Sequence, residues 1–417
     1  MREMKDSGIE WIGQIPKDWD VVPHKRVMHK VKKICEQYSG EDIISLTMNG
    51  VIKRDLTAGG KMPTSFDGYQ YVKPNDLLLC LFDIDVTPRC VGVVKDYGVT
   101  SPAYSRFVMH DGYYNAYYDY LLRAIDDDKV FVHLSKNLRS SLTESDFGAI
   151  KTCVPSLAEQ KRIVTFLDAQ CAEIDAVLEK TRASIEEYKK LKQAVITQAV
   201  TKGIRGDRPM KDSGSVWFEE IPCNWVMKRI KYLFHIKKDI AGKEGYTVLS
   251  ITQRGIQPKD LSKNEGQIAA NYSQYQLLAP GDFAMNHMDL LTGWVDISKY
   301  SGVTSPDYRV FVLDDAEKND SSYYLYLMQM CYFNRIFYGL GQGVSGMGRW
   351  RLQADKFLNF PVVVPPVDEQ KEIASYLNEK CSCIEVMIAK KQQYLTEIEN
   401  YKKSLIYEYV TGKKEVI

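Results

Sequence analysis

The sequence is poor in features that identify several common protein classes. Its 417 residues carry 55 Lys and Arg against 54 Asp and Glu, so the net charge of +1 gives no overall attraction to nucleic acid. The longest apolar run, residues 77–82, is far too short to span a bilayer, and the N-terminal residues include no apolar signal segment. The nine cysteines contain no Cys-x-x-Cys pair, which favours reduced cysteines in a cytosolic protein. We therefore expect a cytoplasmic protein of two to four domains.

Motifs that carry catalysis are also missing. There is no Gly-x-x-x-x-Gly-Lys-Ser/Thr loop to hold nucleotide phosphates, and neither Asn-Pro-Pro-Tyr nor Asp-Pro-Pro-Tyr occurs. The six histidines form no cluster with the spacing of metal ligands. We therefore expect no metal, no cofactor and no catalytic residue in this chain, and the pattern favours a binding and assembly protein over an enzyme.

What the sequence does contain is a duplication. Val154-Pro-Ser-Leu-Ala-Glu-Gln-Lys161 returns 210 residues later as Val364-Pro-Pro-Val-Asp-Glu-Gln-Lys371. A second segment, Met4-Lys-Asp-Ser-Gly8, returns 206 residues later as Met210-Lys-Asp-Ser-Gly214. Each copy is followed by two tryptophans on either side of an Ile-Pro pair. Tryptophan at this spacing usually packs in a core. A period of about half the chain indicates a tandem duplication rather than a solenoid.

Each Glu-Gln segment opens a long helix with an apolar stripe, for example Ile163, Leu167 and Cys171 in the first copy. A helix of roughly 40 residues is about 60 Å long and cannot bury its stripe alone. We expect the two helices to pair antiparallel within one chain. Ser156 and Glu159 predict a capping box at the first helix start. In the second copy Pro366 replaces the serine, and Asp368 is the predicted cap.

The segments before the helices predict mixed domains of strands and helices. Residues 44–47 and 249–252 alternate apolar and hydroxyl side chains before a turn, and tyrosine-rich helical stretches follow further on. We predict an α+β fold with two similar domains, residues 1–154 and 205–364. Helices within 155–204 and 365–417 would join them as an antiparallel coiled coil with a pseudo-twofold.

These motifs resemble a known family, the specificity (S) subunits of Type I restriction-modification enzymes. Pro-Ser-Leu-Ala-Glu-Gln-Lys161 and Pro-Pro-Val-Asp-Glu-Gln-Lys371 are similar to the proline-acid-Glu-Gln signature of the family. Val-Thr-Lys-Gly203 and Val-Thr-Gly-Lys413 resemble its helix terminators, and the Asp-Ser-Gly segments resemble the start of its target-recognition domains. The resemblance covers the whole length, with two copies of three motifs in register.

The resemblance implies a function and a set of partners. Residues 1–154 and 205–364 would be target-recognition domains that each recognise one half of a gapped sequence in double-stranded DNA. The helices would set the gap and bind two modification (M) subunits, and two restriction (R) subunits would complete the complex. The family uses S-adenosylmethionine in the M subunit and ATP with Mg in the R subunit. No cofactor is implied for this chain.

Base contacts do not carry over from the family, so we chose candidates by side-chain type and loop position. Arginine, asparagine and glutamine can form two hydrogen bonds at once with the edge of a guanine or adenine base, whereas lysine mostly neutralises phosphate. The candidate DNA-binding residues are Asn49, Lys53, Arg54, Arg89, Asn137 and Arg139 in the first domain, and Gln253, Arg254, Lys259, Gln342, Arg349 and Arg351 in the second.

Two other functions stay open at the level of sequence. The chain could be a scaffold that resembles an S subunit but has no DNA specificity of its own. It could also methylate or cut DNA itself, although the missing catalytic motifs argue against an enzyme.

Overall fold

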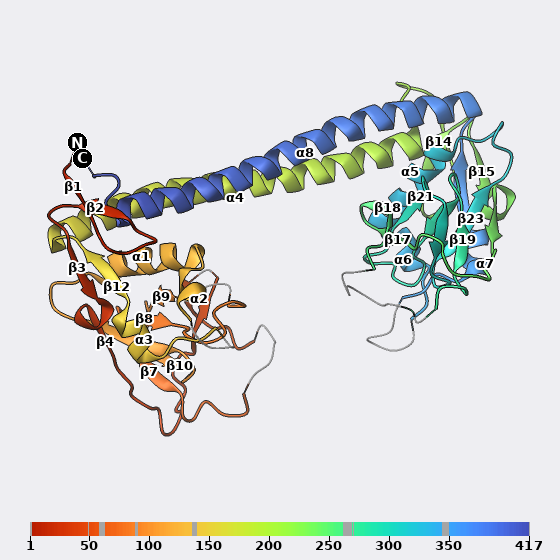
Figure 1. Cartoon of the computed structure of the whole chain (residues 1–417). Coiled ribbons are helices and arrows are strands. Elements are labelled where there is room, and N and C mark those ends of the chain that lie inside the picture. Colours follow the sequence, from red (N-terminus) through yellow and green to blue (C-terminus); the bar gives the residue numbers. More distant parts are fainter. Residues whose placement is uncertain are drawn as a thin grey trace. The chain divides into compact units, whose positions relative to one another are not determined.

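The structure, a computed structural model, describes residues 2–48, 50–57, 63–87, 91–135, 140–261, 269, 271–343 and 350–416. The chain divides into two compact units. Unit 1 comprises residues 1–182 and 393–417, and unit 2 comprises residues 183–392. The division falls inside two long helices, α4 (Leu157–Lys202) and α8 (Val367–Val410). Each unit therefore consists of a globular part and one stretch of each long helix (Figure 1).

Within its described residues, the globular part of unit 1 mixes short strands with three helices and a 3-10 turn. In chain order these are β1 (Met4–Asp6), β2 (Gln14–Pro16), β3 (Asp20–Pro23), η1 (His24–Arg26), β4 (Met28–Lys30), β5 (Ile44–Thr47), β6 (Gly50–Lys53), β7 (Gln70–Val72), β8 (Leu77–Leu79), β9 (Val91–Val93), β10 (Gly98–Thr100), β11 (Ser105–Met109), α1 (Asn115–Asp127), α2 (Val130–Leu134), α3 (Glu144–Ala149) and β12 (Lys151–Val154).

The globular part of unit 2 has the same order of elements. They are β13 (Met210–Asp212), β14 (Glu220–Pro222), β15 (Val226–Arg229), η2 (Ile230–Tyr232), β16 (Phe234–Lys237), β17 (Leu249–Thr252), β18 (Gly255–Pro258), β19 (Gln276–Leu278), β20 (Phe283–Met285), β21 (Val295–Ile297), β22 (Gly302–Thr304), β23 (Arg309–Leu313), α5 (Ser321–Phe333), α6 (Ile336–Gly339), α7 (Ala354–Asn359) and β24 (Pro361–Val364).

The sheets of the two units correspond strand by strand. A four-stranded antiparallel sheet has the order β4-β11-β8-β9 in unit 1 and β16-β23-β20-β21 in unit 2. The small pairs β1-β2, β3-β12, β5-β6 and β7-β10 match β13-β14, β15-β24, β17-β18 and β19-β22. The predicted α+β fold and tandem duplication are confirmed.

The long helices complete the core of each unit. The apolar stripe at the start of one helix and the end of the other packs against the globular part, as single helices cannot bury such a stripe alone. In unit 1 the buried residues are Ile163, Leu167 and Cys171 of α4 with Leu405, Ile406 and Val410 of α8. In unit 2 they are Ile196, Ala199 and Val200 of α4 with Ile373, Leu377 and Cys381 of α8.

Polar pairs between the helices confirm the predicted antiparallel direction. In unit 1, Lys402 binds Asp175 at 2.6 Å and Arg182 binds Glu399 at 2.6 Å, so residue numbers rise along α4 while they fall along α8. In unit 2, Lys192 binds Glu385. Each of these pairs has at least one side chain that is more than half exposed, so the buried apolar stripe rather than the ion pairs holds the helices together.

Glycine ends each long helix because both positions need a backbone that other residues rarely adopt. Gly203 and Gly412 follow the ends of α4 and α8 with φ of 79° and 72°. A Cβ on Gly412 would also come within 2.4 Å of the Pro16 side chain, and one on Gly203 would meet the guanidinium of Arg208. The repeated Thr-and-Gly ending thus combines a left-handed helix cap with close packing.

A buried aspartate recurs in both units with a different cation. In unit 1, Asp76 binds the Arg106 guanidinium at 2.6 Å, and both side chains are less than a tenth exposed. In unit 2, Asp282 occupies the same position, but Lys237 from β16 reaches it at 2.7 Å. The framework therefore needs a cation at this carboxylate but accepts it from either of two neighbouring strands, because an unpaired buried charge is costly.

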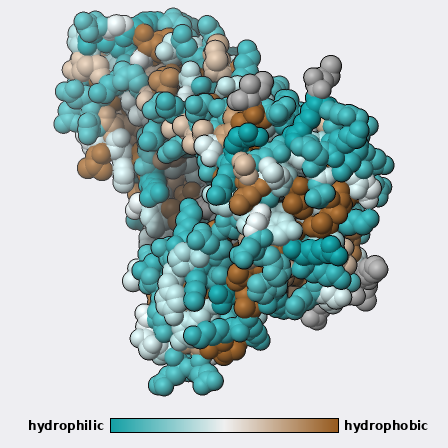
Figure 2. All heavy atoms as spheres, turned by 90° about the vertical axis from the view of Figure 1, so that its left-hand side faces the viewer, coloured by the Kyte–Doolittle hydropathy of each residue, from teal (hydrophilic) through white to brown (hydrophobic). Residues whose placement is uncertain are grey.

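Among the described residues, no helix is both long enough and apolar enough to cross a membrane. On the face shown in Figure 2, hydrophilic side chains predominate and exposed apolar side chains form small separate clusters.

Candidate nucleic-acid interface

A groove of about 890 Å³ opens on the surface of unit 2 beside the β17–β18 hairpin. The hairpin forms one side, and the segments 286–289 and 305–308 form the others. Three of the candidate DNA-binding residues line it: Gln253, Arg254 and Lys259. All three lie on or directly after this one hairpin.

The tip of this hairpin presents two exposed polar side chains, Gln253 and Arg254. The backbone N–H of Arg254 donates to the hydroxyl of Thr252 at 3.1 Å, and that hydroxyl donates to the carbonyl of Gly255 at 3.0 Å. The Gln253 amide donates to the carbonyl of Thr292 at 3.2 Å. The tip is therefore fixed by local hydrogen bonds, while the Arg254 guanidinium extends from a rigid turn.

Side chains opposite the hairpin add further hydrogen-bonding groups to the groove. Burial raises the pKa of both Tyr275 and Tyr308, so their phenols stay protonated. Asn286 and Asp289 contribute amide and carboxylate groups to the lining. Neutral phenols and amides beside a guanidinium can bond base edges, and tyrosine rings can stack on bases.

None of these four groove residues is among the candidates chosen from the sequence. They lie outside the recognised loops, and three of them are tyrosine or asparagine side chains that mostly pack or cap turns. A comparison of the two copies would have pointed to Asn286, because the equivalent residue in the first copy is Cys80.

The corresponding hairpin of unit 1, β5–β6, carries two candidates, Lys53 and Arg54. The backbone N–H of Arg54 donates to Ile43 at 2.7 Å, as that of Lys259 donates to Val248 at 2.8 Å, which places these two cations at equivalent positions. The Lys53 ammonium donates to Asp42 at 2.7 Å, which raises its pKa. Lys53 is thus already paired on an exposed surface, whereas Arg54 occupies the equivalent of a groove position.

The remaining candidates divide into two groups. Gln342 and Arg351 face each other in an antiparallel bridge, with N–H to carbonyl distances of 2.9 and 3.1 Å, and they do not line the groove. Five candidates lie outside the described residues: Asn49, Arg89, Asn137, Arg139 and Arg349.

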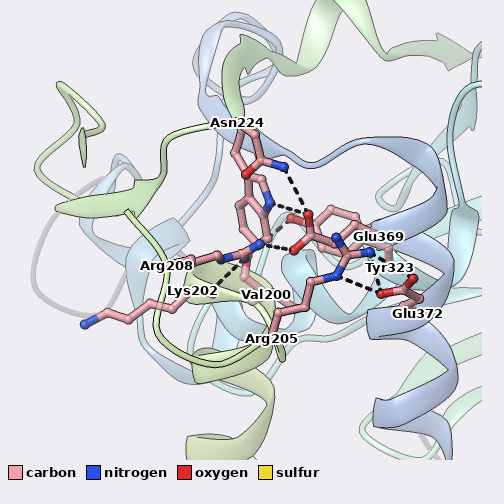
Figure 3. Close-up of polar contacts among 9 residues, drawn as sticks. Val200, Lys202, Arg205, Arg208, Asn224, Tyr323, Glu369 and Glu372 are labelled. Carbon is pink, nitrogen blue, oxygen red and sulfur yellow. Dashed lines mark hydrogen bonds and ion pairs between the residues drawn. The ribbon is translucent and has the colours of Figure 1, made fainter. Parts of the chain in front are cut away.

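A second repeated site surrounds the glutamate of each Glu-Gln pair. In unit 2, the Glu369 carboxylate is 1% exposed and accepts from the Trp225 indole N–H at 3.0 Å and from the Arg208 guanidinium. Asn224 approaches the same carboxylate, and Arg205 binds Glu372 one turn further along α8 (Figure 3). In unit 1, Glu159 accepts in the same way from Trp19, at 3.0 Å, and from Arg2.

The glutamine of each pair ties the long helix to the globular part. The Gln160 amide oxygen accepts from the Tyr114 N–H at the start of α1, at 2.8 Å, and its NH₂ donates to the Pro155 carbonyl at 2.9 Å. Gln370 makes the same two bonds, to Asp320 and Pro365, at 2.8 and 2.9 Å. The side chains of Gln160 and Gln370 therefore have a structural role, since both ends of each amide bind the backbone.

The predicted helix caps need correction. Ser156 does cap α4, because its hydroxyl accepts from the Glu159 N–H at 3.3 Å. The carboxylate of Glu159, however, binds Trp19 and Arg2 rather than returning to the cap, so the capping box is incomplete. Asp368 is not the cap of α8: the helix begins at Val367, and Asp368 lies within its first turn. The capping-box prediction failed because Trp19 and Arg2, the partners of Glu159, are distant from it in sequence.

No group of three or more His, Cys, Asp or Glu side chains with the arrangement of a metal site occurs within the described ranges. The carboxylates of Glu159 and Glu369 are held by arginine and tryptophan, so both have a structural role.

Comparison with known proteins gives consistent matches. A family model described as the Type I restriction modification DNA specificity domain matches residues 222–397. The specificity subunit of the type I restriction enzyme MjaVIII from Methanocaldococcus jannaschii is 22% identical over 289 residues, which is 65% of this chain and 63% of that protein. This chain thus matches slightly less than two thirds of that relative's length.

Two further matches span almost the whole chain. A protein assigned as the MjaX specificity subunit of the same archaeon is 22% identical over 97% of this chain and 96% of its own length. A solved structure from work on complex assembly and conformational transition of the type I R-M system has a TM-score of 0.68 at 12% identity, covering 96% of this chain and 99% of that one. The latter match shows a shared fold.

Proposed function

The chain belongs to the specificity subunits of Type I restriction-modification enzymes, and from that premise we propose that its two globular parts each recognise one half of a gapped DNA sequence. The assignment of residues 1–154 and 205–364 as the two target-recognition domains is part of this proposal. We also propose that the protein acts in the cytoplasm, where it would reach genomic DNA.

The observation that carries the proposal is the groove beside the β17–β18 hairpin. It combines an exposed arginine and glutamine on a rigid turn with a lysine, two protonated tyrosines and an asparagine. Such a set can bond base edges in a major groove and neutralise a neighbouring phosphate. The equivalent hairpin of unit 1 has Met48 where unit 2 has Gln253, and Arg54 where unit 2 has Lys259. Different side chains on one framework favour two half-sites of different sequence.

In this proposal the two long helices fix the distance between the DNA half-sites. α4 has 46 residues and α8 has 44, so at 1.5 Å per residue each is about 65–70 Å long. One turn of DNA is about 34 Å, and helices of this length can serve two neighbouring major grooves. A fixed helix length would give a fixed spacer between the half-sites.

The family implies DNA and the modification and restriction subunits as partners. We propose a core of this chain with two M subunits, joined by two R subunits in the full enzyme. The M subunits would hold S-adenosylmethionine and methylate adenine, and the R subunits would use ATP and Mg. The near-neutral charge of this chain suits a complex in which the M subunits provide much of the positive surface around the DNA.

The test is single-molecule sequencing of host DNA for methyladenine, with the gene intact and deleted. Loss of a gapped, asymmetric methylated motif on deletion supports the proposal and gives both half-sites and the spacer. If no motif changes in a host whose modification subunits are expressed, the recognition role fails and a scaffold without DNA specificity replaces it.

A pair of matched variants then assigns a half-site to unit 2. Arg254→Ala removes the exposed guanidinium at the groove, whereas Arg229→Ala removes an exposed arginine on β15 that does not line it. We expect Arg254→Ala to relax or alter one half-site and to leave the other half-site and the spacer unchanged. Arg229→Ala should leave the whole motif unchanged. An unaltered motif in both variants would contradict the role of the groove.

A further inference from the structure

Arg309, the first residue of β23, is a buried cation without a carboxylate partner among the described residues. It is 6% exposed. Its guanidinium donates to the Leu352 carbonyl at 2.9 Å and lies 5.1 Å from the centre of the Phe357 ring. Burial and repulsion from Arg351 lower its pKa to about 10, so it remains charged at neutral pH. A buried charge is normally paired, since neither a carbonyl nor a ring neutralises it.

Two further nitrogen-bearing side chains lie beside Arg309. His287 is 5% exposed, and its Nδ1 has no hydrogen-bond partner among the residues that the structure describes. Its Nε2 lies 3.5 Å from the guanidinium of Arg351, which is exposed at the surface. Burial and the charges of Arg309 and Arg351 together lower the pKa of His287 to about 3. The cluster therefore contains two cations, one neutral imidazole and an opening to solvent at Arg351.

One carboxylate of the loop that carries His287 makes hydrogen bonds within that loop. Asp289, two residues after His287, accepts from the backbone N–H groups of Leu291 and Thr292 at 3.0 Å each and from the Thr292 hydroxyl. These bonds hold its own loop together. The segment 344–349, which precedes Arg351 and lies outside the described residues, has the sequence Val-Ser-Gly-Met-Gly-Arg and contains no acid.

The duplicated unit shows that the fold does not require these cations. Sheet register places Ser105 of unit 1 at the position of Arg309, since each pairs with the last residue of the neighbouring strand, Leu79 or Met285. The carbonyls of Leu81 and His287 accept equivalent N–H groups, from Leu142 and Leu352. Ser141 then corresponds to Arg351. Unit 1 thus has the same framework with Ser105, Leu81 and Ser141 at the positions of Arg309, His287 and Arg351.

We propose that Arg351, with His287 and Arg309 behind it, forms a binding site for a phosphate group of the DNA, present in unit 2 and absent from unit 1. This inference rests on the proposed function and deepens it. Asn286 and Met288, on either side of His287 in sequence, line the groove, so one loop connects the phosphate site with the base-recognition surface. An arriving phosphate would supply an anion, which Arg309 and Arg351 lack among the described residues.

The experiment measures DNA binding by the full-length chain assembled with its modification subunits across a series of salt concentrations. The probes are a duplex carrying the methylated motif and a duplex of equal length without it. Loss of one phosphate contact should weaken binding to both duplexes by the same factor and reduce the slope of log K against log salt by about 1. We expect this for Arg351→Ser, which introduces the residue of unit 1 at an exposed position. Arg229→Ser is the matched control and should keep the wild-type slope.

Each of the other outcomes would refute the phosphate contact, sequence recognition or the binding of DNA at this site. An unchanged salt slope in Arg351→Ser, or a loss confined to one base pair of the motif, would refute a phosphate contact. Equal binding of both duplexes by the wild-type complex would refute sequence recognition, while the slope of Arg351→Ser would still decide the phosphate site. If inorganic phosphate at constant ionic strength raises the Tm of the wild-type chain, but Arg351→Ser leaves the salt slope unchanged, the site binds free phosphate and not DNA.

Discussion

Replacing Glu369 by alanine should strongly destabilise unit 2. The carboxylate is 1% exposed and is shared by the indole of Trp225 and the guanidinium of Arg208, whose side chain is 15% exposed. Removing one member of a buried ion pair typically costs about 3–5 kcal/mol, because the remaining charge stays buried without a partner. The Trp225 N–H also loses its acceptor. We therefore expect the free energy of unfolding of unit 2 to fall by about 3–5 kcal/mol.

Glu372→Ala provides a control on the same helix face, three residues later. Its carboxylate binds Arg205 at 2.9 Å with good geometry, but both side chains are about half exposed. Exposed pairs contribute little to stability, and we expect no measurable loss. Glu369→Gln should fall between the two variants, since the amide oxygen can still accept from Trp225 but no longer neutralises Arg208.

Peptide-resolved hydrogen exchange under increasing urea measures the two units separately. Destabilisation by Glu369→Ala should appear in peptides from residues 183–392, and peptides from residues 1–182 should change less. The reasoning is refuted if Glu369→Ala is as stable as Glu372→Ala. It is also refuted if the loss of protection is spread equally over both units.

Three further predictions concern buried groups. Burial lowers the pKa of His24 to about 4, below its ordinary value of 6.5, so the unfolded chain binds more protons than the folded chain between these pH values. The free energy of unfolding should therefore fall by about 1.4 kcal/mol per pH unit as the pH decreases from about 6.5 to 4. Replacing His24 by isoleucine, the residue of unit 2 at this position, should remove this pH dependence in urea titrations of unit 1. Asp76→Ala leaves Arg106 buried without its acid and should destabilise unit 1 by about 3–5 kcal/mol in the same assay. Tyr323→Phe removes a hydroxyl that donates to two backbone carbonyls and should cost unit 2 about 0.5–1.5 kcal/mol, with hydrogen exchange rising at the end of α4.

Several features of this protein follow from the sequence alone, because they depend on local or periodic patterns. The apolar stripes from Ile163 and from Ile373 specify long helices that must pair, and the antiparallel pairing was predicted correctly. The duplicated segments specify two similar domains. The indoles of Trp19 and Trp225 were expected to pack, and both rings are buried in the two cores.

Local chemistry was a poor guide where the partner is distant in sequence. Glu159 and Glu369 lie at helix starts, so a capping role was the natural prediction, yet their carboxylates bind residues 140 or more positions away in sequence. Desolvation decides this competition: a carboxylate buried by packing gains more from an indole N–H and a guanidinium than from a backbone cap that water can replace.

Only the tertiary structure decided which polar residues act together. Gln253, Arg254 and Lys259 are close in sequence, but Asn286 and Tyr308 join them because antiparallel strands bring separate loops to one edge. Strand register also decides the partners of the buried charges in unit 2. Asp282 is paired by Lys237. Arg309 lies one position before the equivalent of Arg106, and it therefore lies near His287 and Arg351 instead of beside Asp282. A shift of one residue along a strand changes the face on which a side chain lies, and composition cannot reveal it.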